Sequence, residues 1–150
     1  MKQIAAVGAL LMMLGAAGTA FAGEVEVKML NKGTEGVMVF EPSFVQIQPG
    51  DAVKFVAADK GHNAESIEAM SPEGATSFAG KVNEEPSIVF DKPGVYGVKC
   101  KPHYAMGMVV LIVVGQPDNI EKAKAVSHPG KAKQTFAKLF DTLTTRIAAK

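Results

Sequence analysis

The sequence predicts a mostly β domain, an antiparallel sandwich or barrel, followed by two C-terminal helices. Between residues 23 and 115 the chain consists of short β-type runs separated by turn residues at fairly regular intervals. No long amphipathic helix pattern lies between these runs, which argues against a parallel α/β sheet. After Gly115 the apolar residues recur at spacings of three and four, which is typical of helices.

Composition and charge limit the class of protein further. The chain has 150 residues, of which 47% are hydrophobic and 21% charged, so it can form a packed core and is not a disordered chain. Its single cysteine, Cys100, excludes a core held by internal disulfides. Lys2 is one of the 16 basic residues and lies in a segment that we expect to be removed, which leaves 15 basic against 15 acidic residues. This balance lacks the basic excess of nucleic-acid-binding proteins, so we expect no nucleic-acid partner.

Residues 1–22 have the pattern of a secretory signal peptide. Lys2 is followed by an uncharged run from Ile4 to Ala17, and Ala20-Phe21-Ala22 forms a small-x-small cleavage site. A membrane anchor kept in the mature protein is the alternative, but this run is shorter than the roughly 20 residues that a spanning helix needs. We therefore expect cleavage after Ala22, one mature domain at residues 23–150 and no membrane insertion.

The strands are expected in the segment 23–115. Glu24–Met29 alternates polar and apolar residues, which predicts one buried and one solvated face. Gln48-Pro49-Gly50-Asp51 has the composition of a turn between two later runs. Those runs and the others expected to form strands are residues 37–40, 44–47, 53–57, 87–90, 95–100 and 108–114. Between His62 and Glu85 the pattern is too irregular to place elements.

Two helices are expected within residues 118–150. Asp118 is the expected N-cap of the first, with Glu121 three residues later as in a capping box, and His128-Pro129-Gly130 should end it. The second helix has one apolar stripe, which we expect to cover the sandwich; a membrane-surface helix is the less common use of such a stripe. The stripe consists of Phe136, Leu139, Phe140, Leu143 and Ile147.

The side chains with metal-binding chemistry cluster near the end of the β region. Tyr96, Val98 and Cys100 share one face of the strand expected there, so the thiol points inward if its two neighbours do. His103 and Met108 follow within one loop. A second imidazole is available from the Gly-His-Asn sequence at residues 61–63, just past the end of another expected strand.

Two histidines, one cysteine and one methionine match a trigonal His₂Cys plane with a long axial thioether, the arrangement of blue-copper electron-transfer sites. A Cys-His pair alone would be weak support for such a site. The Cys-x-Pro-His sequence, with a methionine five residues after the histidine and a separate upstream Gly-His-Asn, is a much more specific signal.

With these residues the chain resembles the small blue copper proteins of the cupredoxin family. The segment from Cys100 to Met108 and the paired C-terminal helices resemble the pseudoazurin branch, and the resemblance extends over essentially residues 23–150. It implies an eight-stranded, cupredoxin-like Greek-key β-sandwich and one copper ion held by His62, Cys100, His103 and Met108.

The resemblance also implies a function. The implied protein is a periplasmic electron carrier and not an enzyme. Its copper cycles between Cu(II) and Cu(I), and it passes single electrons to a redox partner. Family analogy favours copper nitrite reductase in denitrification as that partner, with c-type cytochromes as others. A monomer is the default for a carrier that meets its partners briefly.

Two residues beside the ligands have implied supporting roles. Asn63 resembles the family asparagine whose backbone N–H donates to the cysteine sulfur and whose side chain connects the two ligand loops. Pro102 stands where another backbone N–H could reach this sulfur, and proline has none. Fewer hydrogen bonds leave more electron density on the sulfur and lower the reduction potential.

In the family, partners dock where the edge of the imidazole matching His103 emerges through an apolar surface patch. Met38 and Met106 resemble apolar residues of that patch. Four lysines could form a basic ring that steers an acidic partner, with an ordinary solvated surface as the alternative: Lys32, Lys60, Lys99 and Lys101.

Other functions of the same residues are less well supported. A copper carrier or storage protein is the main alternative, since the same ligands bind cuprous ion, although carriers gain from open sites. A Cys100–His103 nucleophile would need an accessible thiolate of low pKa and would leave Met108 without a role. Zinc would make little use of the methionine.

The remaining titratable residues have simpler expected roles. His128 precedes a proline between the helices and is expected to be exposed and outside any metal site. Glu65 with Glu68, and Glu84 with Glu85, are expected to lie on solvated faces.

Overall fold

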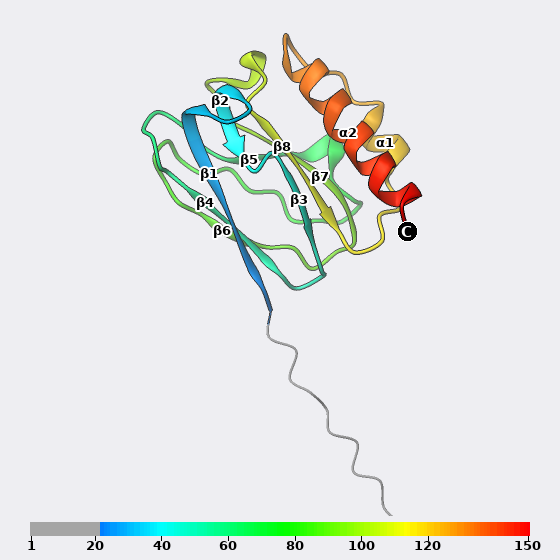
Figure 1. The fold of residues 1–150 in the computed structure, drawn as a ribbon. Helices are drawn as coiled ribbons and strands as arrows, with labels where there is room; N and C mark the ends of the chain where they lie inside the picture. The colour runs from blue at the N-terminus through cyan, green and yellow to red at the C-terminus, as the bar shows by residue number, and fades with distance from the viewer. Residues whose placement is uncertain (1–21) are drawn as a thin grey trace, which may run out of the picture.

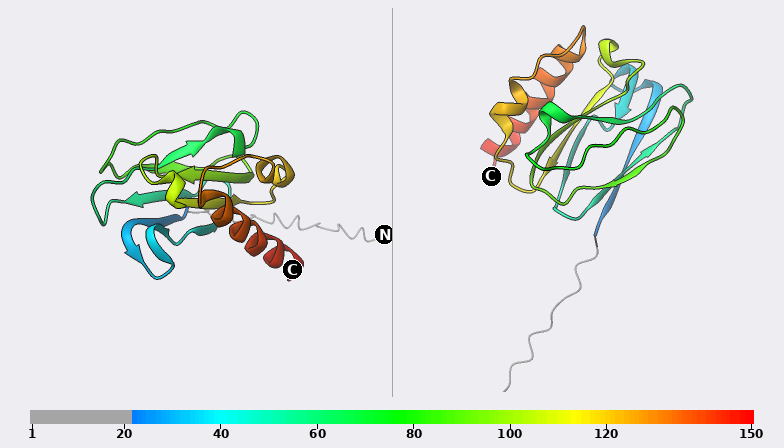
Figure 2. Two further views of the ribbon diagram at one scale, coloured as in Figure 1. Left: turned by 90° about the horizontal axis from the view of Figure 1, so that it is seen from above. Right: turned by 180° about the vertical axis from the view of Figure 1, so that it is seen from behind.

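Residues 22–150 of the computed structural model form two β-sheets packed face to face, with helices against the outer side of one sheet (Figures 1 and 2). Each sheet has four strands, and the order of the strands fits a Greek-key β-sandwich. The mostly β fold class with two C-terminal helices is therefore confirmed. The expected signal peptide lies, except for Ala22, outside the described residues.

The first sheet has the strand order β2-β1-β4-β6. β1 (Glu24–Gly33) pairs antiparallel with β2 (Gly36–Glu41) and parallel with β4 (Ala52–Val56). β4 in turn pairs antiparallel with β6 (Ser87–Val89). Alternate residues of β1 and β4 are buried, as the period of two predicts.

The second sheet has the order β3-β8-β7-β5. β3 (Phe44–Ile47) runs parallel to β8 (Val109–Val114), and β7 (Gly94–Lys99) is antiparallel to both β8 and β5 (Glu65–Ile67). Two strand pairs, β1/β4 and β3/β8, are parallel and so depart from the antiparallel pairing expected of the sandwich. The chain crosses from one sheet to the other between these strands, and an alternation pattern carries no information on strand direction.

The strands β7 and β8 form the middle of the second sheet and separate two hydrophobic cores. All six residues of β8 are buried, which explains its uninterrupted apolar sequence. One face of the pair packs against the first sheet, and the other packs under the helices. Cys100 and Met108 belong to the inner of these two cores, at the ends of β7 and β8.

The helical segment consists of α1 (Ile120–Lys124) and α2 (Ala132–Ala148). Four members of the predicted stripe are buried against the sheet: Phe136, Leu139, Phe140 and Leu143. Ile147 is 50% exposed, so its assignment to the core stripe was wrong. The last turn is held by polar contacts, because Arg146 donates to Gln46 Oε1 at 2.8 Å and lies over the Phe44 ring.

The start of α1 differs from the prediction. Asn119, not Asp118, occupies the N-cap position, and no side chain caps the helix. The Asn119 side chain instead accepts from the N–H of Val95 at 2.7 Å and donates to the carbonyls of Val95 and Met70. This buried amide attaches the helical segment to β7, which the capping pattern alone does not reveal.

The irregular segment between His62 and Glu85 contains β5 and the 3-10 helix η1 (Glu68–Met70). Met70 is fully buried against Gly97 of β7, where any side chain at position 97 would overlap the Met70 sulfur.

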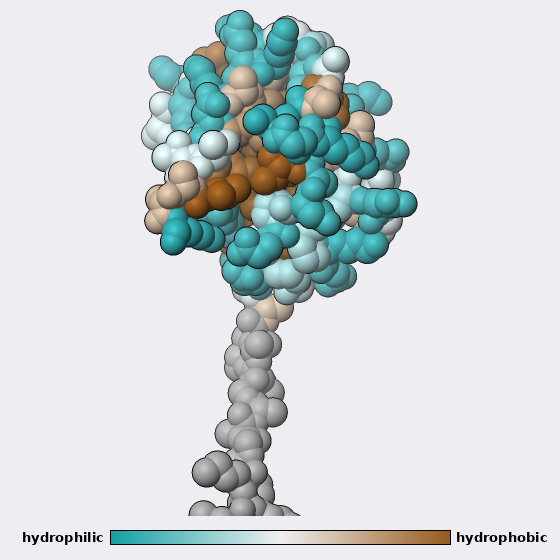
Figure 3. Space-filling model, turned by 90° about the vertical axis from the view of Figure 1, so that its right-hand side faces the viewer, coloured by the Kyte–Doolittle hydropathy of each residue, from teal (hydrophilic) through white to brown (hydrophobic). Residues whose placement is uncertain are grey.

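The helical side of the molecule is largely hydrophilic, with one apolar strip across its middle (Figure 3). Within residues 22–150 no helix is long and apolar enough to cross a membrane.

Candidate metal centre

Three segments bring the predicted ligands together at one end of the sandwich. His62 comes from the loop between β4 and β5, and Cys100 directly follows β7. His103 and Met108 belong to the β7–β8 loop, which contains the 3-10 helix η2 (Tyr104–Met106). This loop lies at the end of the sandwich opposite to the start of β1 (Figure 1).

The donor atoms of His62, Cys100 and His103 converge. The two Nδ1 atoms are 3.1 Å apart, and Sγ lies 3.8 Å from Nδ1 of His62 and 3.6 Å from Nδ1 of His103. A point equidistant from three atoms with these separations is about 2 Å from each, close to the bond lengths of a first-row metal to nitrogen and sulfur ligands. The residues present therefore fit a single bound metal ion.

Backbone hydrogen bonds fold the ligand loop back on itself. Cys100 N donates to the carbonyl of Met108 at 3.0 Å, and the carbonyl of His103 accepts from Met106 N and Met108 N. Gly107, at a φ of 91°, supplies the left-handed turn that closes the loop. Met108 is thereby held next to Cys100 through the backbone, and both residues are buried in the same core.

A residue that the sequence did not reveal orients His62. Asn31 in β1 places its Oδ1 2.9 Å from Nε2 of His62, which is fully buried. A buried imidazole that binds a metal through one nitrogen needs a hydrogen-bond partner for the other. The prediction of His62 as a ligand therefore implies that such a partner exists. Which residue supplies that partner depends on the packing of β1 against a loop 31 residues away.

Asn63 connects the two ligand loops in the way that the resemblance implied. Its Oδ1 accepts from Lys101 N at 2.7 Å, and its Nδ2 donates to the carbonyl of Gly80 and to Glu65. The backbone N–H groups of Asn63 and His103 also face the sulfur of Cys100 and act to lower its pKa. The latter N–H is a second donor that the sequence analysis did not anticipate.

Burial controls the protonation of the cluster. Desolvation lowers the pKa of His62, and the neighbouring His103 lowers it further, so the imidazole is neutral and keeps a lone pair for a metal. Desolvation raises the pKa of the Cys100 thiol, and this effect exceeds the opposing backbone N–H groups. A buried thiol of raised pKa does not suit the alternative of a nucleophilic enzyme.

The surface around His103 is partly apolar. His103 and Met38 are half-buried, Pro102 is exposed, and Met106 is 46% exposed. Val37, which the sequence analysis did not include, is 57% exposed in β2, the strand that carries Met38. Pro102 and Met106 thus add exposed apolar side chains to the loop that carries this imidazole.

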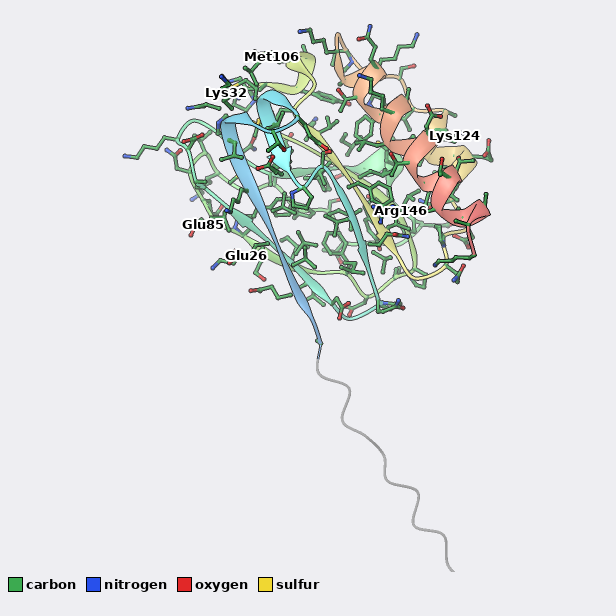
Figure 4. The ribbon with its side chains drawn as sticks, in the orientation of Figure 1. Glu26, Lys32, Glu85, Met106, Lys124 and Arg146 are labelled. Carbon is green, nitrogen blue, oxygen red and sulfur yellow. The ribbon has the colours of Figure 1, made fainter. Side chains whose placement is uncertain are left out.

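The four lysines do not have the same environment. Lys32, Lys60 and Lys101 are exposed, and Figure 4 shows Lys32 and Met106 at the same end of the molecule. Lys99 is half-buried, pairs with Glu65 at 3.3 Å and lies over the Tyr104 ring. Its charge is therefore partly compensated.

Two expectations outside the ligand set need correction. His128 is half-buried, not exposed, with Nδ1 2.6 Å from the hydroxyl of Tyr104. It is not among the three converging donors. Glu65 is half-buried in its ion pair with Lys99, so it does not lie on a solvated face. Glu84 and Glu85 are exposed, as expected.

A β-sandwich with two imidazoles and one cysteine sulfur converging at its end, and a buried methionine in the same ligand loop, has the features of a type 1 copper protein. The model of the plastocyanin/azurin family of copper-binding proteins matches residues 27–115. The pseudoazurin of Paracoccus pantotrophus is 50% identical over 133 residues, covering 88% of this chain and 90% of its own. That of Methylorubrum extorquens is 52% identical over 122 residues, covering 81% and 82%.

Solved structures agree with the sequence comparisons. The crystal structure of pseudoazurin from Methylobacterium extorquens matches with a TM-score of 0.78 at 50% identity, covering 80% of this chain and 98% of that one. Pseudoazurin from Hyphomicrobium denitrificans matches with a TM-score of 0.77 at 43% identity, with the same coverage. The chain therefore belongs to the plastocyanin/azurin family of copper-binding proteins, in its pseudoazurin branch. Members of this family are electron carriers, not enzymes.

Proposed function

We propose that the chain is a periplasmic electron carrier in which His62, Cys100, His103 and Met108 hold one copper ion. The observation that carries this proposal is the convergence of three donor atoms onto a common point about 2 Å from each. Copper bound there would supply a Cu(II)/Cu(I) couple, which accepts and gives one electron. The soft thiolate and thioether favour copper over the metals that prefer oxygen ligands.

The protein part of this function is to keep the donors in place. His62 is held by Asn31, the two ligand loops are joined by Asn63, and Cys100 is anchored at the end of a central strand. Donors on packed elements move little when the charge of the site changes. A small rearrangement makes electron transfer fast.

We further propose that partners approach the face around His103. The imidazole is half-buried while the other two converging donors are fully buried, which supports His103 as the path from the cluster to the surface, and we propose that Met38 and Met106 form part of the apolar contact there. The exposed charges of Lys60 and Lys101 would steer an acidic partner, of which copper nitrite reductase is the first candidate and c-type cytochromes are the next.

Stopped-flow reduction of copper nitrite reductase at several salt concentrations tests the partner. We expect a rate that falls as salt rises, because salt screens the steering charges. Lys101→Glu should slow the reaction, whereas Lys124→Glu should not, because Lys124 lies in α1, on the side of the molecule away from Lys32 (Figure 4). Equal rates for the two variants would contradict docking at His103.

The site also speaks against the second candidate, a copper carrier or storage protein. His62, Cys100 and Met108 are fully buried, so metal exchange would require the loops to open. An electron carrier should show a reversible one-electron wave in cyclic voltammetry and should lose copper to a chelator slowly. Rapid release of copper, with no reversible wave, would favour the carrier or storage function.

Export rests on the proposed signal peptide. Its removal after Ala22 would give a mature chain that begins at Gly23, at the start of the described domain. Intact mass measurement of protein from a periplasmic extract tests this. A mass that includes residues 1–22 would contradict cleavage.

A further inference from the structure

The linker between α1 and α2 packs directly on the ligand loop. Tyr104 follows His103 in that loop, and its hydroxyl lies 2.6 Å from Nδ1 of His128 in the linker. Two residues after His128, Gly130 leaves no space for a side chain, because a Cβ there would overlap the carbonyl of Ala105. The helical segment therefore touches the loop through both a side chain and the backbone.

A second hydrogen bond lies beside the first. Lys131 N, immediately before α2, donates to the carbonyl of Ala105 at 2.9 Å. Gly107 on the same loop faces Thr135 and Lys131 from α2 and its start. The short η2 helix is thus held on its outer side by residues that are distant in sequence from the metal cluster.

His128 is itself held in a fixed orientation. Its ring lies against Phe136 of α2, with centroids 4.4 Å apart and an angle of 35°, and meets the Tyr104 ring edge-on. Burial lowers the pKa of His128, so the imidazole is neutral at neutral pH. The Tyr104 hydroxyl and Nδ1 of this neutral imidazole share one hydrogen bond.

We propose that His128 and Tyr104 are positioning residues for the ligand His103, through which the C-terminal helices keep the ligand loop in one conformation in both oxidation states. This inference rests on the proposed function. Tyr104 is covalently next to His103 in the β7–β8 loop, so a shift of the Tyr104 backbone is passed to the backbone that carries the ligand imidazole. A loop released from His128 could relax after reduction, which would stabilise the reduced state and increase the rearrangement that each electron transfer requires.

The test compares variants that remove only this hydrogen bond. Tyr104→Phe removes the hydroxyl, and His128→Phe keeps an aromatic ring on Phe136 but removes the nitrogen that this hydroxyl meets. His128→Asn offers Oδ1 near the position of Nδ1 and should act as a rescue. Arg146→Ala is the matched control, because it weakens the attachment of α2 to β3 far from the ligand loop.

Three readouts are measured on each variant: the reduction potential by cyclic voltammetry, the self-exchange rate by NMR, and the line widths of the His103 ring in the metal-free protein. We expect both Phe variants to raise the preference for the reduced state about two- to tenfold, the value of one ordinary hydrogen bond. Self-exchange should slow and the His103 signals should broaden. The double variant should add little to either single one, since both remove the same bond.

If the Phe variants lose stability as Arg146→Ala does, but keep the parent potential, self-exchange rate and line widths, His128 is structural only and the inference is wrong. A parent protein without a reversible wave would instead contradict the proposed function. The line widths of the metal-free protein would still report on the loop in that case.

Discussion

The side-chain oxygen of Asn31 lies 2.9 Å from Nε2 of His62. This oxygen can only accept, so the proton of the neutral imidazole is on Nε2. Nδ1, the atom that faces Cys100 and His103, therefore keeps its lone pair. A residue of β1 thus selects the tautomer that the metal cluster requires.

Replacing this residue should weaken the site without removing a donor. Asn31→Ala is expected to lower copper affinity roughly 10- to 100-fold, the usual effect of losing a partner of a ligand imidazole. Competition with a Cu(I) chelator measures the change. Lys32→Ala, which alters the exposed neighbour, is the control; the same affinity in both variants would show that Asn31 does not orient His62.

Pro102→Ala should raise the reduction potential. Alanine restores a backbone N–H near the sulfur of Cys100, and a hydrogen bond withdraws electron density from the thiolate. One bond of about 1.4 kcal/mol corresponds to a shift on the order of 60 mV for a one-electron couple. Cyclic voltammetry measures it, and an unchanged or lower potential would count against the role of Pro102.

The buried side-chain amide of Asn119 should contribute more to the stability of the fold than Asp118, the N-cap that the sequence predicted. Asn119→Ala leaves the N–H of Val95 and two carbonyls without partners, at about 1–3 kcal/mol for a buried polar group. We expect a loss of about 2–4 kcal/mol in urea unfolding. Asp118→Ala, at an exposed position, should change stability by less than about 0.5 kcal/mol. Equal losses would contradict the attachment of α1 through Asn119.

Asp51 should make stability depend on pH. Its carboxylate accepts from Gln48 N at 2.9 Å and from Gly23 N at 2.7 Å, and these bonds hold its pKa below the usual range. A lowered folded-state pKa means that the unfolded chain binds the proton more readily, so the stabilisation is present at neutral pH and is lost on acidification.

Thermal unfolding as a function of pH tests this assignment. Asp51→Asn should be less stable than the parent at pH 7, and the difference should shrink as the pH falls through the folded-state pKa of Asp51. Cleavage after Ala22 would turn Gly23 N into an ammonium group, which should strengthen the contact. A difference that does not depend on pH would show that the charge of Asp51 is not involved.

The sequence was sufficient where the chemistry is local. Cys100, His103 and Met108 lie within one loop, so their spacing alone predicted that they could act together. The alternation in β1 and the apolar stripe on α2 predicted which face of each element is buried, because both patterns depend only on residues close together in the sequence.

Contacts between distant segments could not be predicted in this way. Asn31 reaches His62 and His128 reaches Tyr104 only because the sandwich brings separate loops and the helix linker to one end. Asn119 binds buried backbone groups of Val95 and Met70, and Lys99 pairs with the half-buried Glu65, neither of which a local pattern predicts. Strand direction also depends on where the chain crosses between the sheets.

Titration of the metal-free protein with Cu(II), followed by visible absorption, tests the central claim most directly. We predict an intense thiolate-to-copper band that saturates at one equivalent, disappears with ascorbate and returns on reoxidation. Cys100→Ser should fold but develop no such band. A parent protein that stays colourless with copper under oxidising conditions, or a serine variant with the same band, would contradict a copper centre built on Cys100.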